Sequence, residues 1–173
     1  ISMDVSIVTV NYKTADYVQK MLDSLFQYTK SCSFEVFIIE NGSGDDLSHL
    51  EQQFPSVHFI YSKDNLGFAG GCNKGIDEAS GDFLLLVNPD IVFDSDAVSR
   101  IVEMMREDEE VGIGGISLKN MDGSQQDCVW RFPTPHDQIL LLMKLPHIFK
   151  RVGPIDRWLM KDFDYSKTAD VDQ

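Results

Sequence analysis

The stretch from residue 82 to residue 90, Asp-Phe-Leu-Leu-Leu-Val-Asn-Pro-Asp, constrains the fold of this chain more than any other. Its five consecutive apolar residues, 83–87, predict a strand that is buried on both faces. The strand ends before Pro89, which leaves Asn88 and Asp90 just past its carboxyl end, the edge of an open α/β sheet where ligands bind. Two oxygen-bearing side chains there could hold Mg²⁺ or Mn²⁺. Such residues also form plain turns and helix caps, so that alternative stays open.

A glycine-rich stretch, 65–75, precedes this strand with the sequence Asn-Leu-Gly-Phe-Ala-Gly-Gly-Cys-Asn-Lys-Gly. Its glycines permit tight turns, and the free N–H groups at the start of a helix favour an anionic ligand. Alternatively, the glycines let a helix pack closely against a sheet. The stretch contains neither Gly-x-Gly-x-x-Gly nor a P-loop, which argues against a nicotinamide-linked oxidoreductase. With a cation at 88–90, it suggests a diphosphate ligand.

Composition excludes several other classes of protein. The net charge of −13, from 28 acids and 15 bases, argues against binding to nucleic acid, which requires a basic surface. The three cysteines and four histidines show no zinc-ligand spacing. The amino-terminal residues lead directly into a strand without a secretory signal, and the longest later apolar run, 139–143, is too short to span a bilayer. A cytoplasmic protein without a transmembrane segment is therefore expected.

Strands and helices are predicted to alternate along the chain. The strands are expected at 5–10, 34–39, 57–61 and 82–87, and the last helix of this series is expected to be capped by Asp94 or Ser95. This alternation predicts a three-layer α/β/α fold with a mostly parallel central sheet, to which a hairpin-like segment after residue 115 adds a mixed edge.

The composition changes near residue 133. Four prolines and one short helix near 136–145, with no strand, characterise residues 133–173. We therefore expect a ligand-binding domain at 1–132, followed at 133–173 by the start of a second, incomplete region.

Polar residues also follow the first two predicted strands. Asn11 and Tyr12 follow one, and Glu40 and Asn41 follow the other, so that all four should lie at the same edge of the sheet. The carboxylate of Glu40 could accept a hydrogen bond from a base N–H, and Tyr12 could stack on a base. Asn41 with Gly42 could equally be no more than a turn.

Taken together, these segments resemble a family 2 glycosyltransferase of the GT-A (Rossmann-like) fold, most closely the bacterial rhamnosyltransferase-like members. The resemblance is carried by residues 5–12, 36–43, 65–75 and 85–90, and more weakly by 131–135 and 171–172.

The resemblance implies transfer of a sugar from a nucleoside diphosphate sugar, linked to UDP or dTDP, to a saccharide or lipid-linked saccharide acceptor. The transfer would invert the anomeric carbon, use Mg²⁺ or Mn²⁺ held by Asp90 and Asn88, and serve polysaccharide biosynthesis. A lipid-linked acceptor would place the protein peripherally at the inner face of the membrane. The residues expected to bind the donor are Val10, Asn11, Tyr12, Glu40, Asn41, Asn65, Gly67, Phe68, Ala69, Gly70, Asn73, Asn88, Pro89 and Asp90.

The sequence departs from the family pattern in three ways. Glu40 stands where the family usually has aspartate, and Asn88 replaces the first aspartate of the family's Asp-x-Asp metal motif. Family members also continue past a Val-Asp segment to a motif that bears the catalytic base, whereas this chain ends at Gln173. By this resemblance we expect residues 1–132 to form the nucleotide-sugar-binding GT-A domain and residues 133–173 to be the incomplete start of the acceptor-side region. The catalytic base is expected to be missing from this part.

Two other functions remain open at this point. One is a non-catalytic module that binds nucleotide sugars. The other is a sugar nucleotidyltransferase, which would need a glycine-rich basic loop directly after the first strand. Residues 11–14 contain no glycine, which disfavours the second alternative.

Overall fold

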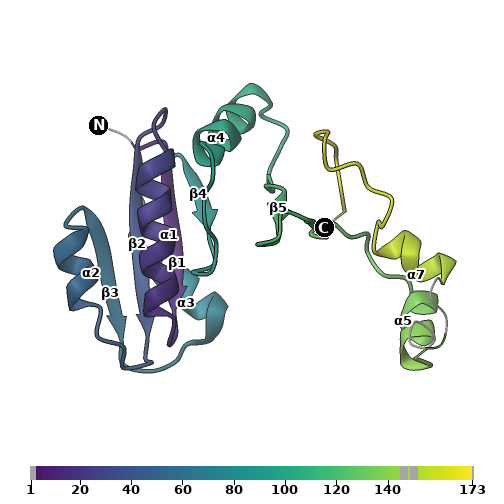
Figure 1. The fold of residues 1–173 in the computed structure, drawn as a ribbon, viewed down its shortest axis with the longest axis horizontal. Coiled ribbons are helices and arrows are strands. Elements are labelled where there is room, and N and C mark those ends of the chain that lie inside the picture. The colour runs from purple at the N-terminus through teal and green to yellow at the C-terminus, as the bar shows by residue number, and fades with distance from the viewer. Residues whose placement is uncertain (1–2, 145–147, 149–151, 173) are drawn as a thin grey trace. The chain divides into compact units, whose positions relative to one another are not determined.

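The structure of the chain is a computed structural model that describes residues 3–144, 148 and 152–172 (Figure 1). The contacts divide it into two units, residues 1–114 and 115–173, which are described separately. The functional division expected at residue 133 lies inside the second unit and stays a prediction. The elements of the first unit are β1 (Val5–Asn11), α1 (Ala15–Tyr28), β2 (Phe34–Asn41), α2 (Ser48–Gln53), β3 (Val57–Ser62), α3 (Gly67–Ile76), β4 (Phe83–Leu86) and α4 (Ala97–Glu107).

The four strands of the first unit form a parallel sheet in the order β3-β2-β1-β4. The register pairs Asn11 of β1 with Glu40 of β2, and Glu40 with Tyr61 of β3. Because the strands are parallel, their carboxyl ends lie at one edge, which we call the rim: the residues that end β1, β2 and β3 and the loops that follow all four strands. The predicted α/β fold with alternating strands and helices is confirmed.

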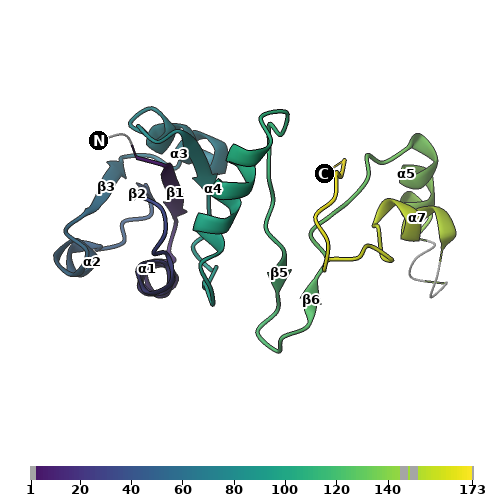
Figure 2. The ribbon, with the colours of Figure 1, turned by 90° about the horizontal axis from the view of Figure 1, so that it is seen from above.

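Helices cover both faces of this sheet (Figure 2). One face packs against α1, α2 and α4, and its core includes Ile7, Leu22 and Val98. The other face packs against α3, where Cys72 belongs to a buried cluster that includes Val8 and Val10. A Cβ added at Gly75 would lie 2.6 Å from Cγ1 of Val8, so this helix can approach the sheet only without a side chain there. Close packing of a glycine-rich helix is thus part of the explanation for the 65–75 stretch.

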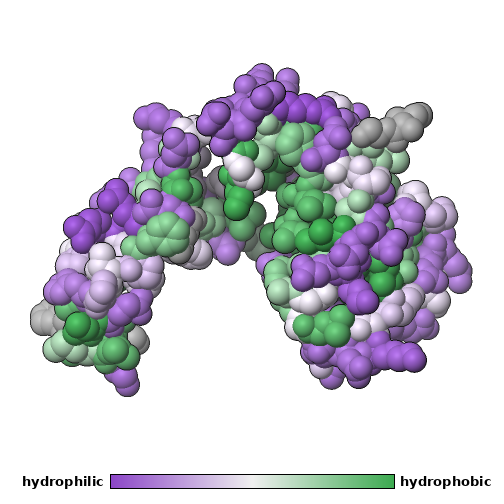
Figure 3. All heavy atoms as spheres, turned by 180° about the vertical axis from the view of Figure 1, so that it is seen from behind, coloured by the Kyte–Doolittle hydropathy of each residue, from purple (hydrophilic) through white to green (hydrophobic). Residues whose placement is uncertain are grey.

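The prediction that the strand at 83–87 is buried on both faces is wrong. Leu84 and Leu86 are exposed by 50% and 49%. In the described residues, β4 is an edge strand that pairs with β1 alone, and α3 packs over β1 and β2 instead. The face of the molecule opposite α1 carries hydrophobic surface in this unit (Figure 3). An apolar run therefore indicated the strand correctly but not its burial.

The cap predicted for the fourth helix is also displaced. The N-cap of α4 is Asp96, not Asp94 or Ser95, and its carboxylate accepts a hydrogen bond from the Ser99 backbone N–H. The other oxygen of Asp96 accepts from the Lys30 backbone N–H at 3.2 Å. Asp96 therefore joins the start of α4 to the loop after α1, a tertiary contact that local sequence does not reveal.

The second unit contains β5 (Leu118–Lys119), β6 (Gln125–Gln126), α5 (Pro135–Leu142) and α7 (Gly153–Trp158). β5 and β6 form an antiparallel hairpin, as expected after residue 115, but they pair as a separate two-stranded sheet. The short helix expected near 136–145 is confirmed as α5, and residue 145 lies outside the described residues. No helix in the described part of the chain is long and apolar enough to cross a membrane.

At the opposite end of the sheet from the rim, Asp4 is held in the charged form. Its carboxylate accepts from the Ser33 backbone N–H at 2.6 Å and forms an ion pair with Arg106 of α4. The Ser33 N–H, the Arg106 guanidinium and the Ser33 hydroxyl lower the pKa of Asp4 from 3.8 to about 2. A carboxyl group whose pKa is lower in the folded state stabilises the fold above its unfolded pKa, and this contribution disappears as the pH falls toward the folded pKa.

We therefore expect an acid-dependent loss of stability between about pH 4 and about pH 2 that depends on Asp4. In Asp4→Asn this part of the pH dependence should be absent, while Asp77→Asn, at an exposed position beyond α3, should retain it. Urea unfolding at several pH values measures the effect. Identical pH profiles for wild type and Asp4→Asn would contradict the assignment.

Candidate functional site

Three buried polar side chains organise the rim, and the first is Asn11 at the end of β1. Its Oδ1 accepts from the Thr14 backbone N–H and hydroxyl at 3.2 and 2.9 Å. Its Nδ2 donates to Oδ2 of Asp45 at 2.9 Å. These hydrogen bonds hold the loops after β1 and β2 in place. Asn11 is 0% exposed and presents no surface to a ligand.

Asn41, the last residue of β2, joins the strand to the glycine-rich stretch. Its Nδ2 donates to Oδ1 of Asn65 and to the carbonyl of Gly67, both at 3.1 Å, and its Oδ1 accepts from the Leu66 backbone N–H at 3.0 Å. Asn65 Oδ1 also accepts from the Gly67 N–H at 2.8 Å. The side chain of Asn41 therefore does more than form a turn, because it fixes the start of α3 against the end of β2.

Glu40 is likewise buried, with 4% of its surface exposed. Its Oε1 accepts from the Ser43 backbone N–H at 2.7 Å and from the Ser43 hydroxyl, and its Oε2 accepts from the Gly42 N–H at 3.2 Å. The carboxylate thus stabilises the turn that follows β2. Its expected role toward a base remains a prediction.

A second group of the expected residues is exposed and can meet a ligand. Tyr12 follows β1 and is 44% exposed, and Phe68, in the first turn of α3, is 56% exposed. Asn65 and Asn73 are exposed as well. Gly67 has a φ of +71°, the left-handed conformation that glycine adopts without strain, and this turn leads directly into α3. The remaining expected donor residues near them are Val10, which is buried under α3, and Ala69 and Gly70 of α3.

Asn88, Pro89 and Asp90 form the turn that follows β4. The Val87 N–H donates to the Val8 carbonyl at 3.0 Å, which continues the β1–β4 pairing to the start of this turn. The Ile91 N–H donates to the Asn88 carbonyl at 3.2 Å and closes the turn. The side chains of Asn88 and Asp90 are exposed. Because β4 pairs in parallel with β1, the turn lies at the same edge as the ends of β1 and β2.

These two side chains fit a site that would bind a divalent cation with modest affinity. Asp90 offers an anionic oxygen and Asn88 a neutral one, and hard cations prefer such ligands. Among the described residues, no group of three or more His, Cys, Asp or Glu side chains could surround an ion. An ion at this turn would therefore take its other ligands from water and from a phosphorylated ligand, as is usual for Mg²⁺.

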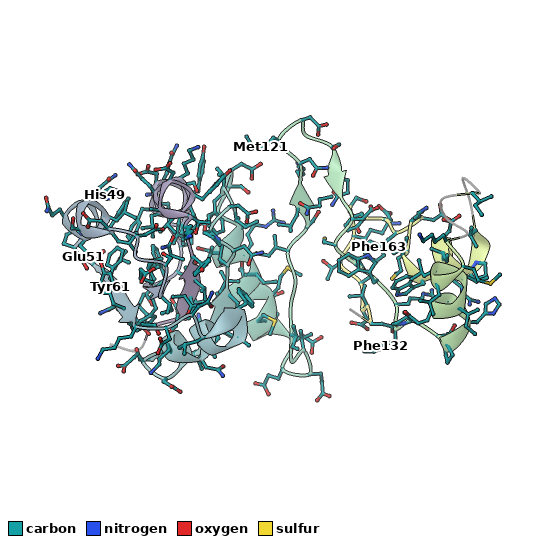
Figure 4. All side chains as sticks on the ribbon, turned by 90° about the horizontal axis from the view of Figure 1, so that it is seen from below. His49, Glu51, Tyr61, Met121, Phe132 and Phe163 are labelled. Atoms are coloured by element: carbon teal, nitrogen blue, oxygen red, sulfur yellow. The ribbon has the colours of Figure 1, made fainter. Side chains whose placement is uncertain are left out.

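Two further rim residues are not distinguished by any pattern in the sequence. Asp45 is bound to Asn11, as described above. Tyr61 of β3 pairs with Glu40 of β2 in the sheet. The Tyr61 hydroxyl donates to Oε1 of Glu51 in α2 at 2.8 Å (Figure 4). Burial and the Glu51 hydrogen bond raise the pKa of Tyr61 to about 12. Tyr61 could be placed beside Glu40 only from the register of β3 against β2, and the sequence alone does not specify that register.

Comparison with known proteins decides the family. Residues 6–154 match the model of glycosyl transferase family 2. This chain belongs to glycosyltransferase family 2. The family 2 chain is 26% identical over 128 residues to TuaG of Bacillus subtilis, a glycosyltransferase named for teichuronic acid biosynthesis, and the match covers 71% of this chain and 50% of TuaG. This chain spans half or less of the length of the curated relatives that it matches.

Solved structures of glycosyltransferases share the fold of this family 2 chain. S. aureus TarS (1–349) in complex with UDP gives a TM-score of 0.55 at 21% identity, over 61% of this chain and 32% of TarS. The mannosyltransferase PcManGT of Pyrobaculum calidifontis, in complex with GDP-Man and Mn²⁺, gives 0.56 at 14% identity, over 69% of this chain and 36% of PcManGT. The GT-A fold is thereby confirmed, whereas the rhamnosyltransferase-like subgroup stays a prediction.

Proposed function

We propose that this chain binds the donor of a glycosyltransferase that moves a sugar from a nucleoside diphosphate sugar to an acceptor hydroxyl with inversion. The observation that carries the proposal is the link from Asn41 to residues 65–67, which joins the end of β2 to the glycine turn and the start of α3. One ligand with a base at β1 and β2 and a diphosphate at α3 would use both parts. Family membership and the nucleotide complexes of TarS and PcManGT support this reading of the rim.

In the proposed mechanism, each part of the rim has one task. Tyr12 covers the base, and the backbone N–H groups at the start of α3, together with the helix dipole, favour the negative diphosphate. Asp90 and Asn88 would hold Mg²⁺ or Mn²⁺. When bound, such an ion neutralises charge on the departing diphosphate. In the proposed inverting reaction, a carboxylate would remove the proton of the acceptor hydroxyl.

The catalytic base is proposed to lie outside residues 1–173. Asp172, a carboxylate of the second unit, accepts a hydrogen bond from the Phe132 backbone N–H at 3.3 Å, which gives it a structural role there. Comparison of donor hydrolysis by this chain and by a longer form of the protein tests the proposal. Equal hydrolysis by both forms would assign the base to this chain, and binding without any transfer in the longer form would favour a non-catalytic module.

Titration of the purified chain with UDP and dTDP, with Mn²⁺ and with EDTA, tests donor binding directly. We expect nucleotide binding to be stronger with Mn²⁺. Residues 88 and 90 offer only two ligands, so the ion would need phosphate oxygens of the nucleotide to fill its coordination shell. No binding of either nucleotide under any condition would refute the proposed function. The acceptor is proposed to be a saccharide or lipid-linked saccharide of a polysaccharide pathway, in keeping with the name of TuaG.

Asp90→Ala is expected to weaken Mn²⁺-dependent nucleotide binding by about tenfold or more. Its free energy of unfolding should change by less than about 0.5 kcal/mol, because Asp90 is exposed and lies outside the core. Calorimetric titration and urea unfolding measure the two quantities. The matched control is Glu103→Ala at an exposed position of α4, which should leave both unchanged. A loss of stability that parallels the loss of binding would mark Asp90 as a structural cap.

A further inference from the structure

Two carboxylates near the end of β2 have different hydrogen-bond partners, and the difference bears on which of them can meet a base. Glu40 accepts three hydrogen bonds from its own turn: two from Ser43 and one from the Gly42 N–H. It is also 4% exposed. A group so engaged positions the turn, and a base could reach it only by displacing those donors.

Asp45 is only partly buried and makes one tertiary hydrogen bond with its side chain. Its Oδ2 accepts from Nδ2 of Asn11 at 2.9 Å. The orientation of that amide is fixed, because Oδ1 of Asn11 accepts from both the Thr14 N–H and the Thr14 hydroxyl. Asn11 must therefore present its NH₂ group to Asp45. Among the described residues, Oδ1 of Asp45 has no hydrogen-bond partner.

We propose that Asp45, and not Glu40, recognises the base of the donor nucleotide, and that it selects a pyrimidine with an imide N–H, uracil or thymine. This inference rests on the proposed function. The N3–H of uracil or thymine is a single donor, and the single oxygen of Asp45 that Asn11 leaves unoccupied can accept it. Tyr12, the residue after Asn11, lies at the same strand end and supplies an aromatic ring for the base.

The same geometry disfavours cytosine and guanine. N3 of cytosine is an acceptor, and a carboxylate has no proton to donate to it. Guanine presents two adjacent donors that pair best with both oxygens of one carboxylate, and Asn11 already holds one of those oxygens. Sites built around a specific hydrogen bond discriminate strongly, because the wrong ligand leaves a polar group unpaired.

The substitution Asp45→Asn tests the proposal because it should reverse the preference. The carbonyl oxygen of the new amide can still accept from Asn11, which places its NH₂ group where the free oxygen was. That group would donate to N3 of cytosine and oppose the N–H of uracil. We expect UDP affinity to fall by about tenfold or more and the ratio of UDP to CDP affinity to fall by a larger factor.

The experiment is calorimetric titration of the whole chain with UDP, CDP and GDP in the presence of Mn²⁺. The control is Asp46→Asn, a neighbouring carboxylate that accepts from the Ser48 N–H at 2.9 Å and should leave all ratios unchanged. Thermal unfolding of each variant verifies folding. An unchanged UDP to CDP ratio in Asp45→Asn, or a changed ratio in Glu40→Gln alone, would overturn this inference and leave the proposed function intact. No nucleotide binding by the wild-type chain would overturn both.

Discussion

Asn41→Asp is expected to lower the free energy of unfolding by about 3 kcal/mol at neutral pH. The side chain is 2% exposed and donates to two oxygens, one on Asn65 and one on Gly67. A carboxylate of the same shape cannot donate, so it would place a buried negative charge against two acceptors. Because the segment that these bonds hold begins α3, nucleotide affinity should fall together with stability.

Urea unfolding and nucleotide titration measure both consequences of Asn41→Asp. The matched control is Asn73→Asp on the exposed surface of α3, where the same chemical change meets solvent and should alter stability by less than about 0.5 kcal/mol. A stability loss of equal size in both variants would show that the contacts of Asn41 contribute little.

Gly42→Ala is expected to destabilise the chain by about 3 to 5 kcal/mol. Gly42 has a φ of +71°, and a Cβ at this position would lie 2.5 Å from the carbonyl carbon of Asp64 and 2.7 Å from the backbone nitrogen of Asn65. Two costs therefore add: the left-handed conformation of a residue with a side chain, and the displacement of backbone that no rotamer change can relieve.

Gly44→Ala separates these two costs. Gly44 has a similar φ of +78°, but an added Cβ there would meet nothing within 4 Å. This variant should lose only about 1 to 2 kcal/mol, the cost of the conformation alone. The difference between the two free energies of unfolding measures how tightly the turn after β2 packs on residues 64–65. Equal losses in both variants would mean that this packing yields without cost.

Much of the fold could be predicted because the strands are short apolar runs separated by helical periodicity. The burial of β4 could not, since Leu84 and Leu86 look the same in the sequence whether or not a helix covers them. The cap of α4 was missed for a similar reason. Asp96 was selected over its neighbours by a hydrogen bond to Lys30, which is 66 positions away in the chain.

At the rim, the sequence predicted which residues gather but not what each does. The positions after β1, β2 and β4 follow from the topology of parallel strands. The distinction between the buried Asn11, Glu40 and Asn41 and the exposed Tyr12 and Asp90 depends on loop geometry that no residue pattern encodes. For this reason Asp45, an ordinary loop aspartate in the sequence, emerged only from its bond to Asn11.

The hydrogen bonds of Asn41 have a thermodynamic consequence for any ligand that binds at the rim. They hold Asn65 and Gly67 in place within the protein itself, without help from an occupant. The entropy of arranging that loop is therefore lost during folding and not during association. A ligand that binds here therefore loses less free energy to the ordering of this loop.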